Sequence, residues 1–147
     1  MIAAEAAAGE DVIYDARAVP SVAYTDPEIA WAGLTEDEAE RSGIDYEVGK
    51  VPWAASGRAL AIERSEGLTK VLTDPGTGRI LGAGMVGPNA GELIAELVHG
   101  IEIGATAADV ALTMHPHPTL SETVKVAAEA AQGVATDIYS PKAVVRG

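Results

Sequence analysis

The sequence predicts an α+β fold, in which an antiparallel sheet of about five strands is covered by helices. Up to about residue 87, the chain consists mainly of short strand-like segments bounded by turn residues. From Asn89 onward, apolar residues recur at the i, i+3, i+4 spacing of one helical face. Because the strands precede the helices and do not alternate with them, this order argues against a doubly wound parallel sheet.

Five segments have the β-branched or apolar character of strands. They cover residues 19–24, 29–34, 46–51, 68–73 and 79–85. Thr25, Asp26 and Pro27 form a turn between the first two segments. The connector 74–78, which contains both Pro and Gly, predicts an antiparallel hairpin between the last two.

A short helix is expected over residues 35–42. Thr35 matches an N-cap, and Glu38, three residues later, completes the capping-box pattern. Gly43 is a typical C-terminal stop. The acidic residues of the first turn lie near the positive end of the helix, where negative charge is favourable.

Three further helices are predicted in the second half of the chain: a long one after Asn89 and shorter ones over 106–112 and 120–132. One face of the last helix is a stripe of small residues: Val124, Ala127, Ala128 and Ala131. Such a stripe permits the close approach of another helix, for example one from a second subunit. At the other end of the chain, residues 1–8 are helix-prone but stop at Gly9 after about two turns.

Composition excludes several classes of function. The net charge of −12 argues against nucleic acid as a partner, because cations supply the affinity for phosphate backbones. The absence of cysteine excludes a disulfide framework and a thiol nucleophile on this chain. No apolar run approaches a membrane span, and the N-terminus lacks a signal-peptide pattern, so a soluble, cytoplasmic protein without a membrane partner is expected.

The negative charge is concentrated in residues 1–49, which hold 12 acidic and 2 basic side chains. A solvated surface explains this distribution, and an acidic docking surface is the alternative. The glycines at 82, 84 and 87 do not match the dinucleotide fingerprint. Close backbone packing is the better explanation of these glycines.

The segment 115–122 contains the side chains of this chain that are best suited to catalysis or metal binding. Pro116 and Pro118 favour an extended backbone that would hold His115 and His117 in place. A cis His117–Pro118 bond would redirect the imidazole of His117. Glu122, in the first turn of the following helix, could accept a hydrogen bond from that imidazole and fix its tautomer. The two residues would then form the histidine–carboxylate half of a catalytic dyad.

Other interpretations of these residues remain open at this point. Thr119 and Glu122 match a capping box, so Glu122 could cap the last helix, alone or in addition to pairing with His117. His115 and His117 could bind a metal, but the sequence offers no third ligand and no metal residue is assigned. On the long helix, a solvated polar face explains three further side chains: Glu92, Glu96 and His99.

Several ordered motifs together resemble one known family. They are YTDPE at 24–28, PWAASGRA at 52–59, GP at 87–88 followed by GEL at 91–93, and HPTLSE at 117–122. Over residues 19–139, the chain is similar to the C-terminal dimerisation domain of the flavin- and pyridine-nucleotide-dependent disulfide oxidoreductases. His115 and His117 ahead of TLS most closely resemble the pattern of the dihydrolipoyl dehydrogenases within this family.

The resemblance implies an active site built across a homodimer. His117 would be the active-site base and Glu122 would orient it. The backbone of His117 and Pro118, joined by a cis peptide, would lie near the flavin of the partner subunit. Dihydrolipoamide would be oxidised, with electrons passing through a disulfide and FAD to NAD, and the lipoyl domains of 2-oxoacid dehydrogenase complexes would be partners.

The same resemblance implies a domain division. Residues 1–18 would be a residual helix and linker from a preceding FAD domain, residues 19–139 the dimerisation domain, and residues 140–147 a tail. FAD and NAD would bind the full-length parent, and the chain alone is expected to bind neither cofactor and to be catalytically incompetent. The alternative is a freestanding, non-catalytic module for dimerisation or protein docking.

Overall fold

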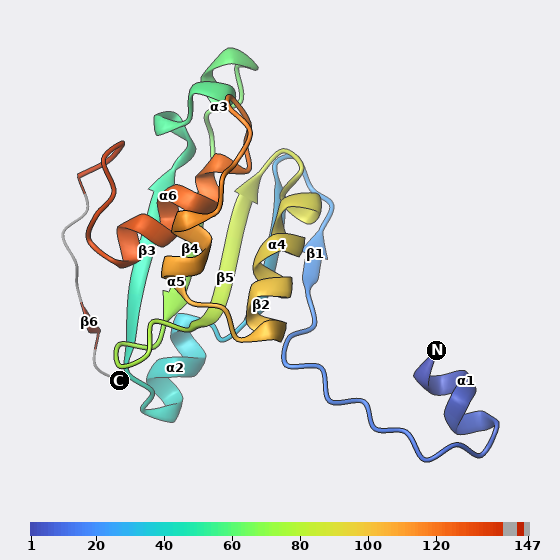
Figure 1. The fold of residues 1–147 in the computed structure, drawn as a ribbon. Helices are drawn as coiled ribbons and strands as arrows, with labels where there is room; N and C mark the ends of the chain where they lie inside the picture. The colour runs from blue at the N-terminus through green and yellow to red at the C-terminus, as the bar shows by residue number, and fades with distance from the viewer. Residues whose placement is uncertain (140–143, 146–147) are drawn as a thin grey trace.

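The central feature of the computed structural model, which describes residues 1–139 and 144–145, is an antiparallel sheet (Figure 1). Its strand order is β1-β2-β5-β4-β3-β6, and every neighbouring pair is antiparallel. The strands are β1 (Ser21–Ala23), β2 (Glu28–Gly33), β3 (Tyr46–Pro52), β4 (Leu68–Thr73), β5 (Ile80–Gly87) and β6 (Val144–Val145). The α+β prediction is therefore confirmed, with β1–β5 as the five predicted strands.

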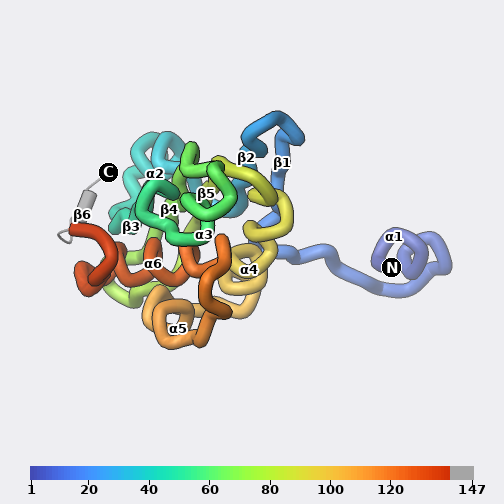
Figure 2. The backbone as a smooth tube through the Cα atoms, turned by 90° about the horizontal axis from the view of Figure 1, so that it is seen from above, coloured from blue at the N-terminus to red at the C-terminus, as the bar shows by residue number. Residues whose placement is uncertain are grey.

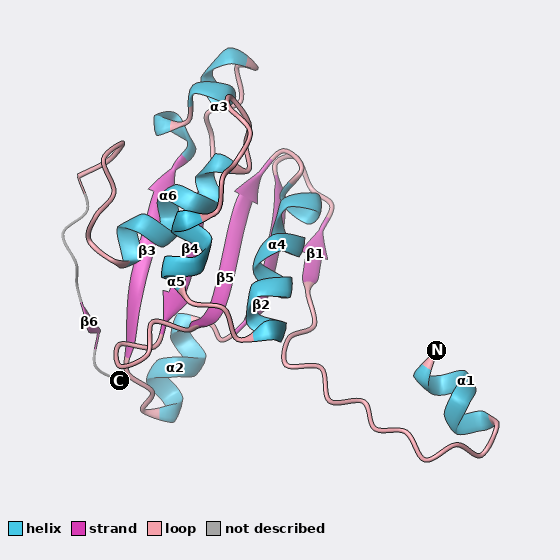
Figure 3. Ribbon diagram, in the orientation of Figure 1, coloured by secondary structure: helices cyan, strands magenta, loops and turns pink. Residues whose placement is uncertain are grey.

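Helices lie on both faces of this sheet, and the N-terminal helix lies apart from it (Figures 1 and 3). They are α1 (Ile2–Ala7), α2 (Glu36–Ser42), α3 (Gly57–Ala61), α4 (Ala90–Ile103), α5 (Ala107–Leu112) and α6 (Glu122–Ala131). Seen from above, α4, α5 and α6 cover one face, and α2 lies on the other (Figure 2). The main core fills the space beneath α4, α5 and α6, where alternate residues of β2 such as Ala30 and Ala32 are buried.

The predicted local signals of α2 and of the hairpin are present. Thr35 and Glu38 form a reciprocal capping box, and Gly43 ends α2 in the left-handed conformation with a φ of 64°. Strands β4 and β5 pair as the predicted hairpin. Gly82 in β5 has no room for a side chain, because a Cβ atom there would overlap the carbonyl oxygen of Leu34.

The small-residue stripe of α6 is buried within the chain itself, where α6 packs against the sheet and against α5. Val124, Ala127, Ala128 and Ala131 are all at most 2% exposed, and α6 packs against β3 and β4 of its own sheet. Gly49 in β3 makes this approach possible, because a Cβ atom there would overlap the backbone of Ala127. The stripe therefore seats α6 on the sheet and so determines where its first turn lies.

A short 3₁₀ turn, η1 (Trp53–Ala55), and α3 lie at one end of the sheet, and neither was predicted. Trp53 is fully buried there, with its ring against Gly87. Its indole N–H donates to Thr69 Oγ1 at 2.9 Å, and Thr69 Oγ1 lies 2.8 Å from Thr123 Oγ1 in the first turn of α6. The hydroxyl of Thr123 donates to the Leu120 carbonyl at 2.8 Å. This chain of buried hydrogen bonds ties the start of α6 to the sheet.

The N-terminal segment is separate from the layers just described. Helix α1 has no buried residue, and a long extended stretch joins it to β1 (Figure 1). The predicted tail at 140–147 lies outside the described residues, except that 144–145 form β6 beside β3. Among the described residues, no helix is long and apolar enough to cross a membrane.

Candidate active site

The segment between α5 and α6 carries both candidate histidines. The peptide bond between His117 and Pro118 is cis, as the resemblance implied, and Asp26–Pro27 is cis as well. Within the segment, the Thr119 hydroxyl donates to the Pro116 carbonyl at 2.7 Å and lies 2.7 Å from Ser121 Oγ. These contacts form a tight turn that leads into α6.

His117 and Glu122 are brought together as the sequence predicted. His117 Nδ1 lies 2.9 Å from Glu122 Oε1, and the imidazole is 80% exposed, against 30% for the Glu122 side chain. An ionised carboxylate can only accept, so the proton of this hydrogen bond belongs to Nδ1. In the neutral ring, Nε2 is then the unprotonated nitrogen and the atom able to take a proton.

Several effects act on the ionisation of Glu122. Burial raises its pKa and is the largest single effect. The hydrogen bonds from the Thr119 N–H and from His117, together with the charges of His117 and His115, outweigh it, so the pKa of Glu122 is lowered. Glu122 is therefore a carboxylate near neutral pH and accepts a hydrogen bond from the imidazole of His117.

Glu122 also performs part of the alternative capping role. Its Oε2 accepts the backbone N–H of Thr119 at 2.8 Å while Oε1 faces His117. The reciprocal half of a capping box is missing, because the Thr119 hydroxyl bonds to Pro116 instead of to the helix. Ser121, not Thr119, occupies the N-cap position of α6 and makes no side-chain cap. Pairing and partial capping thus coexist on one carboxylate.

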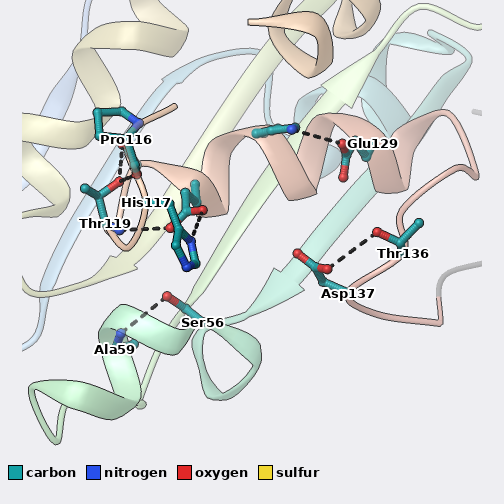
Figure 4. Close-up of polar contacts among 11 residues, drawn as sticks. Ser56, Ala59, Pro116, His117, Thr119, Glu129, Thr136 and Asp137 are labelled. Carbon is teal, nitrogen blue, oxygen red and sulfur yellow. Dashed lines mark hydrogen bonds and ion pairs between the residues drawn. The ribbon is translucent and has the colours of Figure 1, made fainter. Parts of the chain in front are cut away.

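A small cavity of about 80 Å³ lies beside His117 (Figure 4). Besides His117 and Glu122, it is lined by Val51, Ala55, Ser56, Gly57, Thr123, Val126 and Asp137. Ser56 comes from the N-terminus of α3, where its hydroxyl accepts the Ala59 N–H, and Asp137 comes from the segment after α6 (Figure 4). Neither position was predicted as a site residue, because both are far from His117 along the chain, although Ser56 lies within the motif at 52–59.

His115 has a different environment from His117. Its side chain is 5% exposed, Nε2 lies 2.8 Å from Glu96 Oε1 in α4, and Nδ1 lies 3.0 Å from the Thr113 carbonyl oxygen. The expected solvated role of Glu96 was therefore wrong. Both ring nitrogens of His115 are occupied, and the described residues contain no group of three or more potential metal ligands. Nothing in this geometry favours the metal alternative.

Gly82, Gly84 and Gly87 lie within β5 and do not form a phosphate loop at a helix N-terminus. What the geometry does provide is an exposed imidazole with a free Nε2 and a carboxylate behind it. Such an arrangement can act as a base toward a group brought to it from outside this chain.

Residues 19–128 match the family model described as the pyridine nucleotide-disulphide oxidoreductase dimerisation domain. The chain belongs to this family. A dihydrolipoyl dehydrogenase of Haemophilus influenzae is 52% identical over 142 residues, which are 97% of this chain and 30% of the relative. The chain thus spans under a third of the length of the curated relatives it matches.

Solved structures agree with this assignment. LpdA from Mycobacterium tuberculosis superimposes with a TM-score of 0.79 and 28% identity, over 86% of this chain and 28% of that one. The HOCl-induced flavoprotein disulfide reductase RclA from Escherichia coli gives 0.77 and 28% identity, over 84% of this chain and 29% of that one. The family depends on flavin and pyridine nucleotide, and its dimerisation domain supports formation of a homodimer.

Proposed function

We propose that this chain is the dimerisation and active-site-base domain of a dihydrolipoyl dehydrogenase. The observation that carries the proposal is the His117–Glu122 pair, in which Nδ1 faces a carboxylate and Nε2 is left free on an 80% exposed ring. The curated relatives at about 50% identity are dihydrolipoyl dehydrogenases, which supports lipoamide as the substrate class.

In this role, Nε2 of His117 removes the proton of a dihydrolipoamide thiol, so that the thiolate attacks the redox-active disulfide, and the imidazolium then passes the proton to the sulfur that leaves the disulfide. Glu122 holds the ring in the required tautomer and stabilises the imidazolium while the proton resides there. In the complete enzyme, bound FAD would supply electron transfer to NAD from the dithiol that forms when dihydrolipoamide reduces the disulfide. Because this chain contains no cysteine, the disulfide must come from elsewhere, and the exposure of His117 is consistent with a base that serves a neighbouring subunit.

The proposal includes the organisation of the larger protein. Residues 1–18 connect to an FAD domain, residues 19–139 form the interface domain, and the backbone of His117 and Pro118 lies near the flavin of the partner subunit. The chain alone binds neither FAD nor NAD and does not turn over. The complete enzyme is a cytoplasmic homodimer that oxidises the lipoyl domains of 2-oxoacid dehydrogenase complexes.

The test is a pair of substitutions in the complete flavoenzyme containing this chain. His117→Gln is expected to lower dihydrolipoamide turnover by about 10²- to 10⁴-fold, and Glu122→Gln to lower it less, with bound FAD unchanged. His99→Gln, on the exposed face of α4, is the matched control and should leave turnover unchanged. Wild-type turnover in the His117 variant would disprove the assignment of the base.

The size and colour of the native protein separate this proposal from the docking-module alternative. A yellow dimer whose subunit mass is several times 15.0 kDa is expected. A colourless native product of 15.0 kDa would instead favour a freestanding module without redox chemistry.

A further inference from the structure

A second histidine–carboxylate pair lies behind the candidate base. His115 Nε2 contacts Glu96 Oε1 at 2.8 Å, and the two residues are 19 positions apart, on the α5–α6 segment and on α4. The His115 side chain is 5% exposed, whereas that of His117 is 80% exposed. One pair is therefore covered by the protein, and the other faces outward.

The hydrogen bonds of His115 define its protonation when Glu96 is ionised. Nδ1 faces the Thr113 carbonyl oxygen and Nε2 faces a carboxylate oxygen, so both partners are acceptors. The ring satisfies both only by donating from both nitrogens, as an imidazolium. A hydrogen bond between two charged groups is stronger than a neutral one, particularly where water is excluded.

The hydrogen-bonded ring of His115 is close in sequence to His117, the candidate base. Only Pro116 separates His115 from His117, and its fixed φ limits the freedom of the intervening backbone. On the other side of His117, the Thr119 N–H and the imidazole itself bond to Glu122 on α6. The segment is thus attached to α4 on one side of the base and to α6 on the other.

We infer that Glu96 and His115 are positioning residues that hold the His117 imidazole in register with Glu122. This inference deepens the proposed function and rests on it. Neither residue touches the reacting atoms, and their effect is to reduce the motion of the segment between α4 and α6. Burial raises the pKa of Glu122, but the hydrogen bonds from Thr119 and His117 outweigh it, with smaller contributions from the charges of His117 and His115, so the carboxylate that His117 needs is ionised.

Two substitutions of Glu96 separate the loss of the hydrogen-bond partner of His115 from the loss of the negative charge of Glu96. Glu96→Ala removes the acceptor and releases His115. Glu96→Gln retains a partner, because its amide can donate to Nε2 of a neutral His115 while Nδ1 still donates to Thr113. Glu92→Ala is the matched control, since Glu92 lies one turn earlier on α4 and is exposed.

The first readout is the imidazole ¹⁵N spectrum of the 147-residue chain, whose 3 histidines can be assigned by single His→Gln variants. In the unsubstituted chain, we expect protons on both nitrogens of His115 and, on neutral His117, a proton on Nδ1. Glu96→Ala should reduce this Nδ1 preference of His117. Glu96→Gln should preserve it while His115 loses one proton, and Glu92→Ala should change neither ring.

The second readout is kcat for dihydrolipoamide in the complete flavoenzyme. Glu96→Ala should lower it about tenfold or more, because displacement of a catalytic group by about 1 Å can cost 10²-fold, whereas Glu96→Gln should stay within about threefold of the unsubstituted enzyme. KM for NAD should not change in either variant. His115→Leu, which fills the buried space without hydrogen bonds, should reproduce Glu96→Ala and replaces it if that variant does not fold.

An unchanged His117 tautomer and unchanged kcat in folded Glu96→Ala or His115→Leu would overturn the positioning role. Failure of the proposed function would look different, because His117→Gln would then retain full turnover. In that case the spectra of the Glu96 variants would still decide whether the buried pair orients His117.

Discussion

The starts of α2 and α6 share the spacing of Thr followed three residues later by Glu, yet they differ in structure. At α2, the Thr35 N–H donates to Glu38 Oε2 at 2.9 Å and the Glu38 N–H donates back to Thr35 Oγ1 at 3.2 Å. At α6, the first of these bonds is present, at 2.8 Å from Thr119 to Glu122, but the return bond is absent. The start of α5 repeats the reciprocal pattern of α2.

The difference shows how a local motif acquires a second role. The Thr35 hydroxyl donates to the Glu38 carboxylate and accepts the Glu38 N–H, so both halves of the capping box are formed. At α6, the Pro116 carbonyl takes the Thr119 hydroxyl, and the His117 ring takes the free carboxylate oxygen of Glu122. A glutamate that would otherwise stabilise only a helix end is thereby available to orient a histidine.

The largest expected effect is on turnover, and it distinguishes Glu122 of α6 from Glu38 of α2. Glu122→Ala in the complete flavoenzyme should lower dihydrolipoamide turnover by about 10²-fold, because His117 loses both its tautomer control and its stabilising charge. Glu38→Ala removes an equivalent carboxylate from α2 and should leave turnover unchanged. Steady-state kinetics measure both, and equal losses in the two variants would contradict the functional distinction.

The next effect concerns how the start of α6 is held. Thr123→Val leaves the buried hydroxyl of Thr69 without its acceptor and should destabilise the fold by about 1–3 kcal/mol. Thr123→Ser retains the hydroxyl and should cost less. Denaturant unfolding of the chain measures the free energies, and equal values for the two variants would show that the hydroxyl chain does not anchor α6.

A smaller effect is expected for the caps themselves. Thr35→Ala should destabilise the chain by about 1 kcal/mol and speed hydrogen exchange in the first turn of α2. Thr119→Ala removes a hydroxyl that does not cap α6, so the first-turn amides of α6 should keep their exchange rates. Faster hydrogen exchange in the first turn of α6 in Thr119→Ala would show that Thr119 caps α6 as Thr35 caps α2.

The smallest expected effect is on the pH dependence of stability, to which Glu38 and Glu122 should both contribute. The pKa of Glu38 is lowered by hydrogen bonds from the backbone and hydroxyl of Thr35, and that of Glu122 is lowered as described above. A carboxylate with a lowered folded-state pKa contributes stability that is present above its unfolded pKa and is lost as pH falls through the folded value. Glu122→Gln and Glu38→Gln should each flatten the loss of stability below about pH 4. Unfolding curves at several pH values measure this, and an unchanged slope in both variants would contradict the lowered pKa values.

Much of the fold and half of the candidate site could be predicted from sequence, because the contacts concerned are short in sequence. The box at Thr35, the left-handed Gly43 and the pairing of His117 with Glu122 each involve residues within a few positions of one another, and the β4–β5 hairpin joins two strands linked by a short connector. Their geometry follows from backbone and side-chain reach alone. The stripe of α4 could likewise be predicted, because helical periodicity is local.

The tertiary structure decided the contacts that join distant segments. Glu96 has the pattern of a solvated helix face, and only the position of the α5–α6 segment makes it the partner of His115. The same holds for Thr123, whose hydroxyl meets Thr69 54 positions away, and for the α6 stripe, which packs closely on the sheet at Gly49 of β3. The physical reason is that these partners are chosen by which surfaces pack together, and packing depends on the whole chain, whereas caps and turns depend on only a few neighbouring residues.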